Sequence, residues 1–168
     1  MVKSGDVPAE CEGLEDDAWL EITADQMDAV TDNGWARLER DRDTVTGTCA
    51  VLATNSVQWA LRRVLGREIK AKQQAGYTKM HIYGAIRSRG RQASADDKTA
   101  LHVLMWDSGY KLDKVLKGRD IPDTYATVDM GECGIGGMQT PSLYFYTQPD
   151  PELGDGICFD RVFIIFEK

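Results

Sequence analysis

Aromatic and basic residues alternate along residues 77–91 of this chain. If the segment is extended, one face carries Tyr77, Lys79, His81, Tyr83, Arg87 and Arg89, with Arg91 just beyond. Aromatic rings can stack on nucleobases, and cations can neutralise phosphates or carboxylates. The pattern therefore predicts a surface that binds an anionic partner, either an acidic protein surface or single-stranded nucleic acid. A solvated strand face, or pairing with acidic residues of the same chain, would produce the same pattern.

The charge of the chain is unevenly distributed around this segment. The formal net charge is −7, yet residues 62–91 contain nine bases and a single acid, Glu68. Residues 1–43 contain thirteen acids and four bases. A helix over residues 55–74 would place further cations on its outer face: Arg62, Arg63, Arg67 and Lys70. We therefore expect one basic surface, made of this helix face and the 77–91 strand face, with Trp106 of a neighbouring strand supplying another ring.

Cys49, His102 and Asp107 form the one constellation that could support covalent chemistry. A thiol at the start of a helix, followed along the chain by a histidine on a strand and an orienting carboxylate, resembles the arrangement of papain-like cysteine hydrolases. The resemblance covers only the order of these residues. A small buried thiol and an unrelated histidine are the alternative interpretation.

The remaining spacings predict no cofactor and no metal site. The chain contains no C-x-x-C or H-x-x-x-H motif, and Gly131, Gly134, Gly136 and Gly137 precede a strand rather than a helix. Asp150, Glu152 and Asp155 do not match the calcium loop of an EF-hand and are typical of an exposed acidic turn.

The predicted elements define an α+β fold. Val57, Leu61, Val64, Leu65 and Ile69 follow a helical period, which predicts one long amphipathic helix over about 55–74. Alternating or β-branched segments predict strands at 44–53, 77–89, 99–107, 124–129, 142–147 and 157–167, while residues 110–118 could form a short helix. We expect 77–89 and 99–107 to pair as a hairpin. The result would be an antiparallel sheet of about five to six strands, with the long helix packed on one face and short helices near the N-terminus.

Composition sets the expected domain organisation and setting. Residues 1–18 are acidic and interrupted by glycine and proline, which predicts a flexible arm, and residues 19–168 suit a single domain. No apolar run is long enough to span a membrane. Cys11, Cys49, Cys133 and Cys158 are widely spaced, which favours reduced thiols and a cytoplasmic location. We therefore expect a non-enzymatic binding domain whose partner is a protein, with nucleic acid as a second candidate partner and a cysteine hydrolase as the alternative function.

Overall fold

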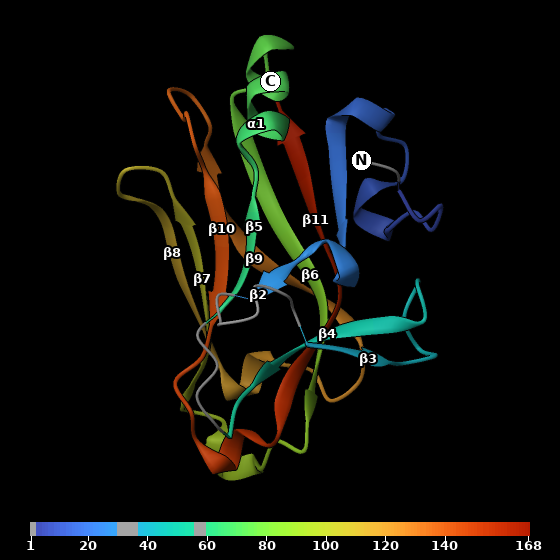
Figure 1. Ribbon diagram of the computed structural model, residues 1–168, viewed down its shortest axis with the longest axis vertical. Helices are drawn as coiled ribbons and strands as arrows, with labels where there is room; N and C mark the ends of the chain where they lie inside the picture. Colours follow the sequence, from blue (N-terminus) through green and yellow to red (C-terminus); the bar gives the residue numbers. More distant parts are fainter. Residues whose placement is uncertain (1–2, 30–36, 56–59) are drawn as a thin grey trace.

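Two antiparallel sheets face each other in the computed structural model, which describes residues 3–29, 37–55 and 60–168. The six-stranded sheet runs β3-β4-β11-β6-β9, and β1 also pairs with β11. Its strands are β1 (Trp19–Thr23), β3 (Arg37–Arg40), β4 (Thr48–Ala53), β6 (Lys79–Arg89), β9 (Ala126–Gly134) and β11 (Gly156–Glu167). The five-stranded sheet runs β2-β5-β10-β7-β8. Its strands are β2 (Asp28–Ala29), β5 (Leu61–Val64), β7 (Thr99–Trp106), β8 (Tyr110–Lys117) and β10 (Ser142–Tyr146). Figure 1 shows the two layers; β8 is an edge strand of the five-stranded sheet, and β3 is an edge strand of the six-stranded sheet.

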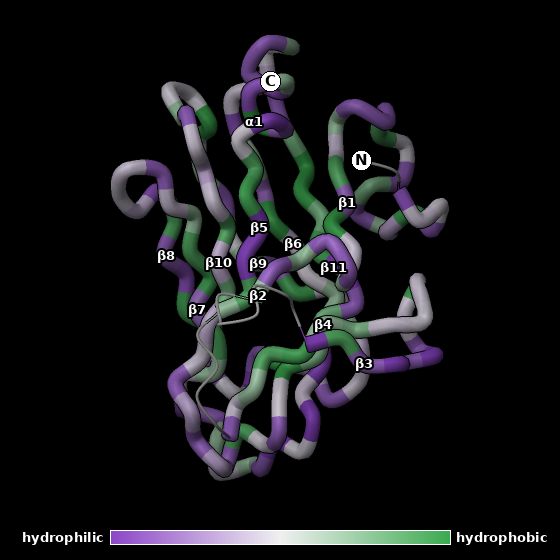
Figure 2. Tube along the Cα trace, in the orientation of Figure 1, coloured by the Kyte–Doolittle hydropathy of each residue, from purple (hydrophilic) through white to green (hydrophobic). Residues whose placement is uncertain are grey.

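The main core fills the space between the sheets. Alternate residues of each strand point inward, so that Met80, Ile82 and Ile86 of β6 share one buried cluster with Leu101 and Val103 of β7. The rings of Phe145 and Phe159 pack across the layers with their centroids 5.0 Å apart. Figure 2 shows the hydrophobic residues concentrated along the central strands and mostly hydrophilic connections around them. Burial of each large side chain contributes about 1.5–3 kcal/mol, so this layer is the main source of stability.

The expected α+β class is wrong, because the protein is a β-sandwich. The helix predicted over 55–74 is reduced to α1 (Gly66–Gln74), and residues 61–64 instead form β5 between β10 and β2. Residues 56–59, including Val57 of the predicted apolar stripe, lie outside the described residues. A short apolar run fits a helix and a buried strand equally well by periodicity. Here the neighbouring strands satisfy the backbone of 61–64, and α1 is the one α-helix in the described ranges.

Two further elements differ from the expectation. The segments 77–89 and 99–107 are extended, but they belong to different sheets and do not form a hairpin. β6 pairs with β11 and β9, whereas β7 pairs with β10 and β8. Residues 110–118, considered as a helix, form β8. Alternation shows that one face of a strand is buried, but it does not say which partner strand lies beside it.

The N-terminal segment lies against the six-stranded sheet. Its short turns are the 3₁₀ helices Ala9–Cys11 and Asp16–Ala18, and a third, Ala24–Gln26, follows β1. They take the place of the expected N-terminal helices. Cys11 is buried against Trp19 and Phe163, and in Figure 1 the blue N-terminal segment lies beside β11. The search of the described residues found no helix with the length and hydropathy needed to cross a membrane.

Candidate functional site

The outer face of the five-stranded sheet gathers aromatic side chains. The strand register places them in rows that cross the strands, because residues opposite one another in an antiparallel pair share a face. We call this surface the aromatic face. One row is Ser142, Trp106 and Tyr110; the next is Arg62, Tyr144, Leu104 and Asp113; the third is Tyr146, His102 and Val115. Asp28 of β2 extends the second row beyond Arg62.

Several rings on this face are open to solvent. Tyr110 is 65% exposed and Trp106 is 42% exposed, which is unusual for large aromatic groups. Their rings meet edge to face with centroids 5.0 Å apart, so each limits the rotation of the other. Leu104, Tyr144 and Tyr146 line a shallow hollow of about 210 Å³ together with these two rings. The face therefore offers a preformed apolar platform on rigid strands.

Polar atoms within the aromatic face lack partners among the described residues. Both ring nitrogens of His102 and the Nε of Arg62 are shut off from solvent without a hydrogen bond. The His102 ring stacks on Tyr146 with centroids 4.3 Å apart and an interplanar angle of 3°. Burial, together with the nearby Asp113 carboxylate, raises the pKa of Tyr146, so its hydroxyl remains a donor at neutral pH. Buried polar groups without partners cost stability, and because these atoms are closed to solvent, a ligand on the surface does not reach them as they stand.

Asp107 fixes the end of β7 that carries Trp106. Its carboxylate accepts hydrogen bonds from the backbone N–H groups of Gln139 and Thr140, each at 3.0 Å. The bond from Thr140, with that from Gln139, holds the pKa of Asp107 below its usual range despite partial desolvation. This side chain thus anchors the loop that leads into β10, and it has no contact with His102 that would make it an orienting carboxylate.

The 77–91 segment lies on the other sheet from the aromatic face. β6 does sort its residues as expected, with alternate side chains buried and half-buried. However, Tyr77 is buried, and Tyr83 stacks between His81 and Phe163 at centroid distances of 4.5 and 5.3 Å. The structure therefore does not unite this segment with Trp106 in one surface.

The cations of the 77–91 segment pair with acids of the same chain. The shortest contacts join Lys79 to Glu132 at 3.1 Å, Arg87 to Asp41 at 3.3 Å, Arg89 to Glu39 at 2.6 Å and Arg91 to Asp96 at 2.5 Å, and a ring nitrogen of His81 lies 2.8 Å from Asp129. Much of the positive field expected from the sequence is thus neutralised locally. Binding of an anionic partner by these residues stays a prediction.

The four cations assigned to one helix face are separated. Arg67 and Lys70 belong to α1, whereas Arg62 and Arg63 belong to β5 and point to opposite sides of the sheet. Arg63 forms an ion pair with Glu68 at 3.1 Å. Only Arg62 of this group joins the aromatic face, opposite Tyr144.

The papain-like arrangement is not formed. Cys49 lies in β4, fully buried in a small cluster with Val51 and Cys158 on the outer side of the six-stranded sheet. His102 lies on the outer side of the other sheet, with the core between them. The hydrogen bond with the neighbouring Cys158 thiol, together with burial, raises the pKa of Cys49, which opposes thiolate formation at Cys49. Nucleophile and base are therefore kept apart by the sandwich.

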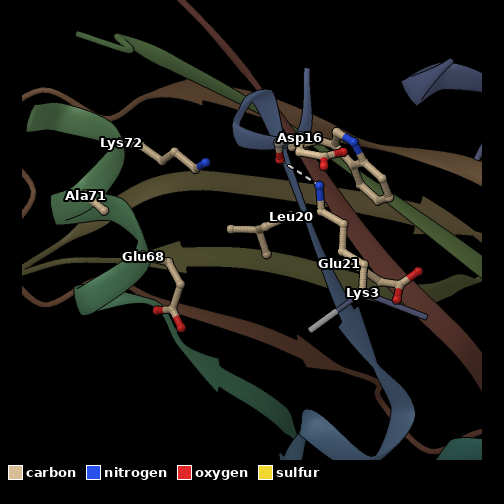
Figure 3. Close-up of a pocket in the computed structure, with 8 residues that line it drawn as sticks. Lys3, Asp16, Leu20, Glu21, Glu68, Ala71 and Lys72 are labelled. Atoms are coloured by element: carbon tan, nitrogen blue, oxygen red, sulfur yellow. Dashed lines mark hydrogen bonds between the residues drawn. The ribbon is translucent and has the colours of Figure 1, made fainter. Parts of the chain in front are cut away.

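A second hollow, of about 230 Å³, lies between α1 and the N-terminal segment. Figure 3 shows Lys3 and Lys72 pointing into it from opposite sides. Lys3 donates to the Asp16 carbonyl at 2.6 Å and lies over the Trp19 ring at 3.8 Å, while Lys72 donates to the Asp17 carbonyl. These contacts tie the N-terminal segment to the sandwich.

Sequence reasoning missed most of the aromatic face. The alternation in Ser142–Thr147 could have placed Tyr144 and Tyr146 on the outer side of a strand. Tyr110 and Asp113 were hidden because residues 110–118 were considered as a helix. No local signal joins these segments, since β7, β8 and β10 are brought together only by sheet pairing.

Comparisons with known proteins identify a shared fold. No family model matches the chain, and no curated protein matches it. Among solved structures, the xylan-binding module CBM15 is similar with a TM-score of 0.52 and 13% identity, over 89% of this chain and 97% of the module.

Larger proteins contain a similar unit. The mosquito-larvicidal Cry4Aa toxin from Bacillus thuringiensis is similar with a TM-score of 0.59 and 10% identity over 89% of this chain. The exo-beta-1,3-galactanase from Phanerochaete chrysosporium is similar with a TM-score of 0.52 and 8% identity over 87% of this chain. This chain spans 24% of the toxin and 29% of the galactanase. The chain thus shares with these proteins a fold of two antiparallel sheets.

Proposed function

We propose that this protein is a carbohydrate-binding domain and that its aromatic face holds the sugar chain. The observation that carries the proposal is the set of open rings around a shallow hollow on one rigid sheet. The axial C–H groups of a pyranose are apolar and slightly positive, so they pack on the negative face of an aromatic ring. The hydroxyl groups of the sugar can donate to and accept from the hydroxyl groups of Tyr144 and Tyr146, two residues that line the hollow.

The shape of the face suits a chain that lies across the strands. Neighbouring strands are about 4.8 Å apart, so a row from β5 to β8 spans about 14 Å. The hollow lined by Tyr144 and Trp106 is shallow and open to solvent, which suits an extended ligand that lies on the surface. The fold likeness to a xylan-binding module over nearly its whole length supports the same class of ligand.

Binding without hydrolysis fits the placement of the carboxylates. Asp28 and Asp113 stand at opposite ends of the second row, four strand spacings or about 19 Å apart. Paired carboxylates that hydrolyse glycosides are roughly 5–9.5 Å apart. These two groups therefore contribute hydrogen bonds at the ends of the row rather than acid–base chemistry on one bond.

Affinity electrophoresis in gels that contain xylan, galactan or soluble glucans tests the proposal. We expect at least one neutral polysaccharide to retard the wild-type protein. Trp106→Ala and Tyr144→Ala should each weaken binding about tenfold or more, because each removes a stacking surface typical of an interface hot spot.

Leu38→Ala is the matched control, since it removes an exposed apolar side chain from β3 of the other sheet. It should leave the retardation unchanged. If the wild type migrates freely in every gel, or if both aromatic variants bind as the wild type does, the assignment is wrong. Retention of a protein partner that both aromatic variants lose would identify the face as a protein-binding surface instead.

A further inference from the structure

Asp113 places an exposed carboxylate beside the hollow of the aromatic face. It lies directly opposite Leu104, which lines the hollow, and it follows Tyr110 on β8. Its charge contributes to the raised pKa of Tyr146, another residue that lines the hollow, so the carboxylate acts on the same space. Within residues 3–29, 37–55 and 60–168, the Asp113 side chain forms no hydrogen bond and no ion pair. Both carboxylate oxygens are therefore open to a ligand.

Two lysines flank Asp113 along β8 without pairing with it. Lys111 and Lys117 are exposed, and by alternation they share the outer side of β8 with Asp113. Neither lysine forms an ion pair with any residue that the structure describes. Their charges offset that of Asp113, so the carboxylate acts as a hydrogen-bond acceptor rather than as the source of a negative field.

The hydroxyl groups of a stacked sugar point toward such a neighbour. When the C–H groups of a pyranose pack on an aromatic ring, its equatorial hydroxyls project sideways from the edge of the sugar. A chain that lies across the strands over Trp106 and Tyr110 turns these edges along the strands, and one edge faces the row that holds Asp113. A carboxylate has two acceptor oxygens, so it can accept one hydrogen bond from each of two adjacent hydroxyls.

The linkage of a glycan decides whether two adjacent hydroxyls are free. In a 1,4-linked chain, each internal pyranose has free hydroxyls at C2 and C3. In a 1,3-linked chain, the glycosidic bond occupies C3, and the C2 hydroxyl has no free neighbour. One hydroxyl can use only one of the two Asp113 oxygens, so a 1,3-linked chain forms the weaker contact.

We propose that the aromatic face prefers neutral glycan chains with 1,4-linkages, and that the Asp113 carboxylate accepts hydrogen bonds from the hydroxyls at C2 and C3 of one sugar. This inference rests on the proposed carbohydrate binding and adds a linkage preference to it. Trp106 and Tyr110 hold the apolar side of the chain, and Asp113 is the specificity-determining residue at its edge.

Polysaccharides of the same sugar with different linkages test the inference. A soluble 1,4-linked galactan is compared with a 1,3-linked galactan, and a glucan of mixed 1,3- and 1,4-linkages is compared with a 1,3-linked glucan. Xylan is compared before and after acetylation at C2 and C3, which masks both hydroxyls and leaves the backbone unchanged. Isothermal titration calorimetry measures the affinities, and circular dichroism confirms that each variant is folded.

We expect the wild type to bind each polymer that contains 1,4-linkages about tenfold more tightly than its 1,3-linked counterpart, because hydrogen bonds to a charged group are strong. Acetylation should weaken the binding of xylan by a similar factor. Asp113→Asn should remove the linkage preference, reduce the effect of acetylation and leave the affinity for 1,3-linked chains within about twofold of the wild type. Asp43→Asn is the matched control, because it makes the same change of charge at an exposed position between β3 and β4 of the other sheet, and it should behave as the wild type.

The outcomes separate this inference from the proposed function. Equal affinity of the wild type for the two linkages, or a linkage preference that survives in Asp113→Asn, overturns the role of Asp113 while carbohydrate binding stands. Tighter binding of the 1,3-linked chains has the same consequence. Absence of binding to every polysaccharide overturns the proposed function, and this inference with it.

Discussion

Arg161 and Glu21 form a buried ion pair. A substitution at either residue affects stability strongly, because the other charge is then left buried without its partner. Arg161 of β11 contacts Glu21 of β1 at 2.6 Å, and both side chains are nearly inaccessible to solvent. Ser4 also donates to the Glu21 carboxylate, from its backbone N–H at 2.6 Å and from its hydroxyl at 2.9 Å. The pair therefore links the N-terminal segment, β1 and β11.

Removing only the arginine should destabilise the fold strongly. Arg161→Met leaves the Glu21 carboxylate buried without its cation, and such a loss costs about 3–5 kcal/mol. Urea unfolding at neutral pH measures it. The double variant Glu21→Gln with Arg161→Met should recover much of the loss, because no charge remains unpaired. A loss below about 1 kcal/mol in the single variant would contradict the assigned role of the ion pair.

The connection into β10 provides a test at the scale of the elements. Asp107 holds residues 139 and 140 in place through its carboxylate, and this loop sets where β10 and its tyrosines begin. The hydrogen bonds from Thr140 and Gln139 hold the pKa of Asp107 below its usual range. A carboxyl group whose pKa is lowered on folding stabilises the fold above its unfolded pKa, and this contribution disappears as the pH falls through the folded value.

We therefore expect Asp107→Asn to cost about 1–2 kcal/mol at neutral pH, and the difference from wild type to vanish at a pH below the ordinary aspartate pKa of about 4. Thermal unfolding across that pH range measures this. Asp113→Asn, at an exposed position of β8, should show no comparable loss of stability at neutral pH. A difference that is constant down to low pH would contradict the assigned role of the carboxylate.

At the scale of the whole molecule, the net charge of the protein favours a neutral partner over a polyanion. The protein is acidic, with a sequence pI of about 4.8, and most cations of the 77–91 segment are paired internally. Long-range attraction to a polyanion is therefore weak. Stacking and hydrogen bonds to a neutral chain are short-ranged and are little affected by salt.

Binding of the neutral polysaccharide should change less than about twofold between about 0.1 M and 1 M salt, because no counterions are released. Calorimetry at both salt concentrations measures this change. A steep loss of affinity for the neutral chain would contradict a face that works through stacking.

The sequence by itself determined where most strands lie and which of their faces are buried. The two-residue period over 77–89, 99–107, 142–147 and 157–167 corresponds closely to β6, β7, β10 and β11. This is a local property, because side chains alternate across any strand whatever its partner. The expected binding role stays a proposal, and the cytoplasmic setting and flexible arm stay predictions.

Only the tertiary structure decided which strands are neighbours, and with them the candidate site. Residues 61–64 could be read as helix until β10 and β2 paired with them, and β6 and β7 proved to lie in different sheets. Strand pairing depends on contacts between segments that are distant in the sequence, and several strands share the same alternation, so local sequence does not determine which strands pair. For that reason Arg62, Tyr144, Trp106 and Tyr110, distant along the chain, meet on one face that no single segment could indicate.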